Sequence, residues 1–107
     1  MELQLTKENF QEFVLDSAEP VMVDFHADWC GPCKMLSKVL SELADTHCVG
    51  KVNVEQEPEL ASEYGAMVIP MVLLFKNGHC IAKAIGYQTK EELEKMFIHA
   101  AGGAAKE

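Results

Sequence analysis

Short apolar runs predict five β-strands in this chain. Residues 21–26 are apolar except for Asp24 and the terminal His26, a pattern typical of a strand buried on both faces of a sheet. Four other short runs rich in β-branched, aromatic or other apolar residues favour strands as well. The predicted strands are residues 3–5, 21–26, 49–54, 71–75 and 79–85.

Four further segments repeat their apolar residues with the 3.6-residue period of an α-helix. Thr6 is a suitable N-cap for the first of them, and a proline in the first turn favours the second and third. Thr89 and Glu92 have the spacing of a capping box before the fourth. The predicted helices follow Thr6, span residues 32–47 and 58–64, and run from Thr89 to Gly102.

The order of these elements favours an α/β fold. Helices between the first three strands favour parallel pairs, because a parallel connection must cross over the sheet. Asn77-Gly78 between the last two strands is a strong signal for a tight hairpin. The sequence therefore predicts a mixed sheet that includes an antiparallel pair and is covered by helices on both faces.

The composition is that of one globular domain. Of the 107 residues, 49% are hydrophobic and 24% are charged, and a chain of this length buries a single core. We therefore expect residues 1–107 to form one domain, with the small-residue segment 102–107 as a frayed tail.

Charge and hydropathy exclude several classes of partner. Nine basic and seventeen acidic residues give a net charge of −8, which repels nucleic-acid phosphates and anionic lipids. The longest apolar run, residues 68–75, contains Pro70 and is far shorter than the roughly 20 residues that span a bilayer. The acidic first twenty residues lack the pattern of a secretory signal, so we expect a cytoplasmic protein.

The sequence Cys30-Gly31-Pro32-Cys33 lies where the strand at 21–26 gives way to the helix at 32–47. Unpaired N–H groups and the positive end of the helix dipole favour the thiolate form of a cysteine at such a place. Cys30 is therefore the expected nucleophile. Cys33 is close enough to form a disulfide with it and is expected to be the less accessible, resolving thiol.

Two other interpretations of the cysteines stay open. Both residues of the pair suit small buried positions. A structural zinc site normally needs four ligands, whereas Cys48 and Cys80 stand alone and Cys48 follows the far end of the helix. We therefore expect no metal and no cofactor.

Residues 25–35, which read FHADWCGPCKM, resemble the active-site segment of the thioredoxin family. The similarity extends over about residues 21–97 and includes KVNV at 51–54, Ile69-Pro70 and LFKNG at 74–78. This resemblance implies the thioredoxin fold, a mixed five-stranded sheet flanked by four helices. It also implies a monomeric protein-disulfide reductase that reduces disulfides of protein substrates and is re-reduced by thioredoxin reductase.

The resemblance implies roles for individual residues. Cys30 matches the attacking cysteine, Cys33 the resolving one, Asp24 the buried proton acceptor and Lys51 its neighbouring base. A buried carboxyl is expected to have a raised pKa, as a general base requires, although a core acid paired with Lys51 is the alternative. The expected substrate-binding residues are Trp29, Gly31, Pro32, Ile69, Pro70, Met71 and Gly86, with a cis bond at Ile69-Pro70 and strand addition at Ile69.

Several positions depart from the family pattern. His26 replaces the usual aromatic residue and, by the period of a strand, faces the same side as Asp24. Lys38 replaces a proline that usually kinks the helix, and Met71 replaces the usual threonine. Cys48 and Cys80 are additional thiols that we expect to be buried.

Two functions of different classes fit these residues. The first is a disulfide reductase, which the intact set of Cys30, Cys33, Asp24 and Lys51 favours. The alternative is a binding module that uses the groove at Ile69 without turnover. Binding alone needs none of the four residues, so we expect the reductase.

Overall fold

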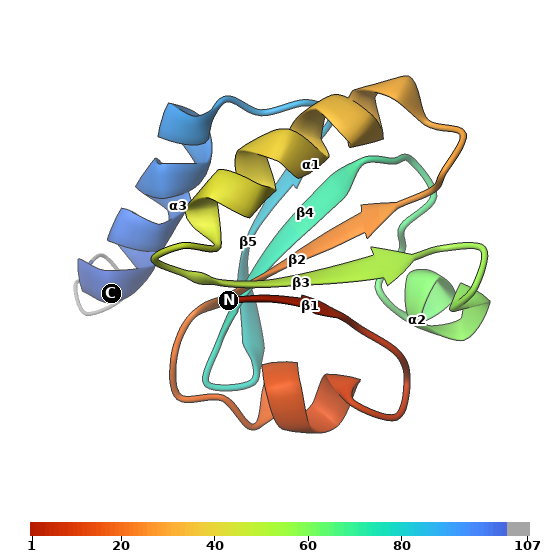
Figure 1. The fold of residues 1–107 in the computed structure, drawn as a ribbon. Helices are drawn as coiled ribbons and strands as arrows, with labels where there is room; N and C mark the ends of the chain where they lie inside the picture. Colours follow the sequence, from red (N-terminus) through yellow and green to blue (C-terminus); the bar gives the residue numbers. More distant parts are fainter. Residues whose placement is uncertain (103–107) are drawn as a thin grey trace.

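A single mixed sheet of five strands lies between two layers of helices (Figure 1). The computed structural model describes residues 1–102, so the predicted tail lies outside the described residues except for Gly102. The strands are β1 (Glu2–Gln4), β2 (Val21–His26), β3 (Cys48–Asn53), β4 (Met71–Lys76) and β5 (His79–Ile85).

The strands are arranged in the order β1-β3-β2-β4-β5. β1 and β2 both run parallel to β3, whereas β4 runs antiparallel to β2 and β5. This topology places β2 between two neighbours near the middle of the sheet, as its apolar sequence predicts.

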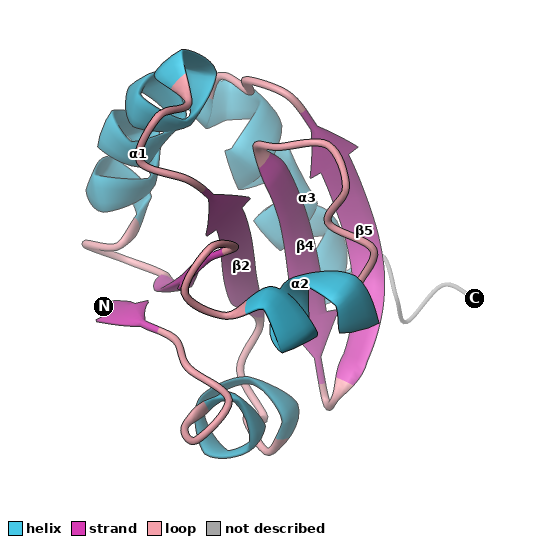
Figure 2. Cartoon of the chain, turned by 90° about the vertical axis from the view of Figure 1, so that its right-hand side faces the viewer, coloured by secondary structure: helices cyan, strands magenta, loops and turns pink. Residues whose placement is uncertain are grey.

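Helices cover both faces of the sheet (Figure 2). They are η1 (Gln11–Leu15), α1 (Gly31–Leu43), α2 (Pro58–Glu63) and α3 (Lys90–Gly102). η1 and α2 lie on one face and α1 and α3 on the other (Figure 1). The mixed five-stranded sheet with four flanking helices confirms the predicted fold class.

The predicted capping box is present at the start of α3, but Thr6 does not cap η1, whose N-cap residue is Phe10 and has no side-chain hydrogen bond. The hydroxyl of Thr6 accepts a hydrogen bond from the Glu8 N–H at 3.2 Å. The Thr89 N–H donates to the Glu92 carboxylate at 2.8 Å, while the Glu92 N–H donates to the Thr89 hydroxyl at 3.1 Å, which completes the capping box. The segment after Thr6 is a π-helix, because the Asp16 N–H donates to the carbonyl of Gln11, five residues earlier.

The predicted end of α1 near residue 47 is wrong, because the helix ends at Leu43. The Asp45 N–H donates to the carbonyl of Glu42 and the Thr46 N–H to that of Leu43, so the chain tightens into a turn there. Asp and Thr favour such turns over a helix interior. β3 correspondingly starts at Cys48, one residue earlier than predicted.

Alternation along the central strands divides the core between the two faces of the sheet. Val21, Val23 and Phe25 of β2 pack with η1 and α2, whereas Met22 packs with α1 and α3. Asp24 has the same parity as Met22 and therefore faces the α1 side. The hairpin between β4 and β5 turns through Asn77 and Gly78, whose positive φ angles of 54° and 81° suit a tight turn.

Gly50 allows a close approach between β3 and the segment that follows β1. A Cβ atom at this position would lie 2.4 Å from Cδ1 and 2.8 Å from Cγ of Leu5. Leu5 is fully buried and cannot move aside easily.

We expect Gly50→Ala to lower the free energy of unfolding by about 1 to 3 kcal/mol through overpacking. Denaturant unfolding of Gly50→Ala, Leu5→Ala and the double variant measures the effect. The double variant should lose less stability than the sum of the two single changes, because Leu5→Ala removes the atoms that clash. Additive losses would show that Leu5 and residue 50 do not compete for space.

Candidate active site

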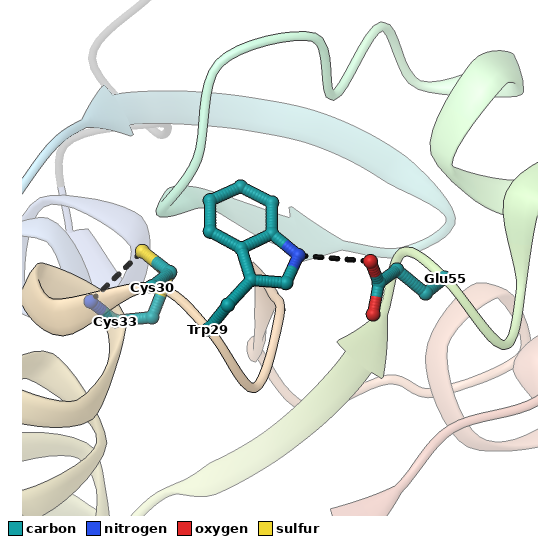
Figure 3. Close-up of a disulfide and its surroundings, with 4 residues drawn as sticks. All are labelled: Trp29, Cys30, Cys33 and Glu55. Carbon is teal, nitrogen blue, oxygen red and sulfur yellow. Dashed lines mark hydrogen bonds between the residues drawn. A yellow bond between two sulfur atoms is a disulfide. The ribbon is translucent and has the colours of Figure 1, made fainter.

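The two cysteines of the predicted pair form a disulfide at the start of α1. Their Cα atoms are 5.2 Å apart, and Cys30 is the N-cap residue of the helix. Sγ of Cys30 accepts a hydrogen bond from the Cys33 N–H at 3.2 Å (Figure 3). The same donor would stabilise a thiolate on Cys30 in the dithiol form. Cys30 is 5% exposed and Cys33 is 2% exposed, so Cys30 is the more accessible by a small margin.

Asp24 is a fully buried acid in the middle of β2. Neither oxygen of its carboxyl group has a hydrogen-bond partner among residues 1–102. Burial raises the pKa of Asp24 from 3.8 to about 7, Lys51 opposes this rise, and Glu2 adds to it. The carboxyl therefore changes protonation state near neutral pH, where a proton acceptor is most useful.

Lys51 is next to Asp24 in the sheet but its ammonium group has other contacts. The two residues are register partners between β2 and β3. Nζ of Lys51 lies 3.5 Å from Oε2 of Glu2 in β1, and it donates a hydrogen bond to the hydroxyl of Ser37 in α1. The alternative of an Asp24 carboxyl satisfied by a close ion pair with Lys51 is therefore wrong for this structure.

A surface pocket of about 420 Å³ lies between α1 and the ends of β2 and β3. It is lined by His26, Ala27, Asp28, Cys33, Lys34, Ser37 and Lys51. Nε2 of His26 is buried and has no partner within the described residues. Burial and the nearby Lys51 lower the pKa of His26, while Asp28 partly offsets this change. The imidazole is thus mostly neutral at pH 7 and shares the pocket with Cys33.

Trp29 is exposed, and its side chain is held by a hydrogen bond to Glu55. Its side chain is 67% exposed, and its Nε1–H donates to the carboxylate of Glu55 at 2.8 Å (Figure 3). The side-chain oxygen of Asn53 accepts from the N–H groups of Glu55 and Gln56, which fixes the turn that carries Glu55. A side chain this exposed does not fit a residue that serves only to pack in the core.

The loop before β4 carries a cis peptide bond between Ile69 and Pro70, as the resemblance implies. The carbonyl of Pro70 accepts a hydrogen bond from the Gly86 N–H at 2.8 Å, so the two predicted substrate-binding loops lie side by side. Neither backbone polar group of Ile69 takes part in a backbone hydrogen bond within residues 1–102. Gly31 and Pro32 are exposed at the start of α1, next to the disulfide.

The side chain of Met71, a predicted substrate-binding residue, is buried in the core and does not lie on the surface. Its side chain is 1% exposed and packs in the core with residues of η1 and α2. A side chain buried in the core adds no apolar surface to a substrate groove. Any contribution of Met71 to substrate binding comes from its backbone.

The additional cysteines and Lys38 also differ in their surroundings. Cys48 is half-buried, but Cys80 is exposed on the edge strand β5, so the prediction that both are buried is wrong for Cys80.

Lys38 is exposed on α1, which is a continuous helix from Gly31 to Leu43. Without a proline at this position, α1 keeps the backbone donor of residue 38.

Three polar residues of the site escaped the sequence analysis: Glu2, Ser37 and Ser41. The hydroxyl of Ser41 donates to Oε1 of Glu2 at 3.0 Å. Ser37 and Ser41 are four residues apart and therefore share one side of α1, beside its apolar face, which is the signal that the sequence offers. Their partners on β1 and β3 become evident only from the strand order.

Within residues 1–102 no group of three or more His, Cys, Asp or Glu side chains is arranged to hold a metal ion. The side chains of the candidate site are those of the cysteine pair, Asp24, Lys51 and His26.

No helix within the described residues is long and apolar enough to cross a membrane.

Comparison with known proteins identifies relatives over almost the whole chain. The family model described as thioredoxin matches residues 1–99. A thioredoxin of Alicyclobacillus acidocaldarius is 47% identical over 99 residues, covering 89% of this chain and 93% of its own. Thioredoxins of Rickettsia prowazekii and Chlorobaculum thiosulfatiphilum are 45% and 40% identical, covering 83% and 88% of this chain and 89% and 91% of their own.

These matches agree with the chemistry of the cysteine pair, and the protein is a thiol-disulfide oxidoreductase. More specifically, the chain belongs to the thioredoxin family. Membership of this family and the cysteine pair together support protein-disulfide reductase activity.

The buried carboxyl of Asp24 makes stability depend on pH. Because its pKa is raised in the folded state, Asp24 contributes fully to stability below about pH 4, and this contribution is lost as pH rises through about 7. The interval between 3.8 and about 7 corresponds to roughly 4 kcal/mol.

We expect Asp24→Asn to be more stable than the parent protein at pH 9, by up to about 4 kcal/mol, and to lose most of this advantage by pH 5. Guanidinium unfolding of the oxidised proteins at both pH values measures the difference. Asp45→Asn, at an exposed position after α1, is the matched control for the loss of one charge. An advantage of Asp24→Asn that is equal at both pH values would contradict the assigned titration.

Proposed function

We propose that this protein is a reductant of protein disulfides in which Cys30 attacks and Cys33 resolves. The thiolate of Cys30 attacks one sulfur of a substrate disulfide, forms a mixed disulfide and releases the first substrate thiolate. Cys33 then loses its proton and attacks Sγ of Cys30, which releases the second substrate thiolate and forms the Cys30–Cys33 disulfide. Two electrons pass from the cysteine pair to the substrate.

Asp24 is the proposed acceptor of the Cys33 proton. A carboxyl with a pKa of about 7 can take up a proton near neutral pH and release it afterwards. Cys33 lines the pocket together with Lys51, the register partner of Asp24. The pocket has polar lining and is large enough to hold water beside Cys33. Asp24 does not line the pocket, so the proposed transfer needs such water to reach the buried carboxyl. Lys51 stabilises the carboxylate that forms when the proton leaves.

The substrate segment is proposed to bind in an extended form beside Ile69. The free backbone groups of Ile69 support strand addition, which gives affinity without a code of side chains. Trp29, Gly31, Pro32, Pro70 and Gly86, with the backbone of Met71, complete the proposed groove. Its broad specificity suits a carrier that serves several proteins.

The remaining parts of the proposal concern its setting. Thioredoxin reductase is the proposed electron donor, and the cytoplasm is the proposed compartment, because thiols are kept reduced there. The net charge of −8 disfavours self-association and supports a monomer. No bound cofactor is needed, since the electrons are held by the cysteine pair itself.

The position of the cysteine pair at the start of α1 carries the proposal, and two single substitutions test it. Cys30→Ser should reduce the rate of insulin reduction, with dithiothreitol as electron source, by at least about 100-fold. Cys33→Ser should instead accumulate a covalent complex with the substrate that excess dithiothreitol releases, because the resolving thiol is missing. NADPH with a thioredoxin reductase should replace dithiothreitol for the parent protein but for neither of these two variants.

Cys80→Ser is the matched control, because it removes an exposed thiol outside the pair. It should keep the parent rate and trap no complex. If a Cys30→Ser, Cys33→Ser protein kept full biological activity, the binding module would be the better description. A covalent complex formed by Cys30→Ser rather than by Cys33→Ser would reverse the assigned order of attack.

A further inference from the structure

Glu2 links the edge strand β1 to the polar cluster next to the cysteines. Its Oε2 lies 3.5 Å from Nζ of Lys51, and its Oε1 accepts a hydrogen bond from the hydroxyl of Ser41 at 3.0 Å. Ser41 is one helical turn after Ser37, the second partner of Lys51. Two contacts from two different elements therefore hold the Glu2 carboxylate in place.

The same contacts fix the direction of the Lys51 side chain. This side chain is only 14% exposed, and its ammonium group is engaged by Glu2 and Ser37. Asp24, its register partner, has no hydrogen-bond partner for either carboxyl oxygen among residues 1–102. Lys51, the cation next to Asp24 in the strand register, thus interacts with a second and more exposed carboxylate, that of Glu2.

We propose that Glu2 is a positioning residue that holds the Lys51 ammonium group away from Asp24 and so keeps the buried carboxyl ready to accept a proton. This inference rests on the proposed role of Asp24 as the acceptor of the Cys33 proton. Glu2 touches neither a substrate nor the reacting sulfur atoms, and it acts only through Lys51 and through its own charge.

The two effects of Glu2 on Asp24 have the same sign. The negative charge of Glu2 offsets part of the positive charge that Lys51 presents to Asp24, and it also repels the Asp24 carboxylate directly. Both effects favour the protonated carboxyl, in agreement with the contribution of Glu2 to the raised pKa of Asp24.

The pocket beside Lys51 has other titratable groups, which are His26 of β2, Cys33 and Lys34 of α1, and Asp28 before the helix. On the β4 side the register partner of Asp24 is Val72, which carries no charge. The charged groups that shift the pKa of Asp24 are Lys51 of β3 and Glu2 of β1.

The first experiment is the titration of the Asp24 side-chain carboxyl carbon by NMR in the parent protein and in Glu2→Gln. The amide keeps an acceptor for Ser41 but loses the negative charge. We expect the midpoint for Asp24 to fall by roughly half a pH unit or more. Glu12→Gln, which changes one charge on the opposite face of the sheet, should leave the midpoint unchanged.

Glu2→Asp separates the position of the carboxylate from its charge. Its side chain is shorter by one methylene, so it keeps the charge near β1 but cannot hold Lys51 in the same place. A midpoint below that of the parent protein supports the positioning role, because the charge of residue 2 is kept. A midpoint equal to that of the parent protein overturns it, as does an unchanged midpoint in Glu2→Gln.

The pH dependence of disulfide reduction gives a second readout. A lower titration midpoint means that the Asp24 carboxylate, the proton acceptor, is present at lower pH. Glu2→Gln should therefore move the acidic limb of the rate profile to lower pH by the same number of pH units as the midpoint. In an Asp24→Asn background, in which this limb should be absent, the Glu2 substitution should leave the rate profile unchanged.

The two proposals fail in different ways. If Asp24→Asn alone leaves the rate profile unchanged, the proposed function of Asp24 is wrong, whatever the NMR titration shows. If Asp24→Asn removes the acidic limb but Glu2→Gln moves neither the limb nor the midpoint, Asp24 keeps its role and the inference about Glu2 is wrong.

Discussion

The burial of one carboxyl group, that of Asp24, is the constraint on which the site depends. A carboxyl without a hydrogen-bond partner in a protein interior resists ionisation, because its charge would lose the solvation of water. An ionised acid at this position lowers the free energy of unfolding near and above neutral pH. The same burial lets the acid gain and lose a proton near neutral pH.

The fold places this acid and the cysteines together by simple means. β2 lies near the middle of the sheet and ends directly before the loop that leads to α1. Alternation along β2 directs Asp24 to the α1 face, and Cys30 caps the helix at that end of the strand. Lys51, the register partner of Asp24, contacts Glu2 of β1 and Ser37 of α1, and Glu2 accepts a hydrogen bond from Ser41.

Local sequence signals predicted most of the fold, because they act over a few residues. The capping box at Thr89, the turn at Asn77 and the apolar run of β2 each specify an element without reference to the rest of the chain. The cysteine pair, its helix and the buried acid were predicted in the same way, with the family resemblance supplying the cis bond at Pro70. The partners of Lys51 were not predicted, since β1 and β3 meet only through the sheet order. The burial of Met71 likewise follows from the face on which β4 places it.

The equilibrium potential of the Cys30–Cys33 pair tests the central claim most directly. It is measured against a series of glutathione ratios by the fluorescence of Trp29, with Cys48 and Cys80 changed to serine so that only the pair responds. A reductant of protein disulfides should have a reduction potential of about −270 mV, the value typical of thioredoxins. A potential between about −180 and −120 mV, typical of disulfide isomerases and strong oxidants, would contradict the account.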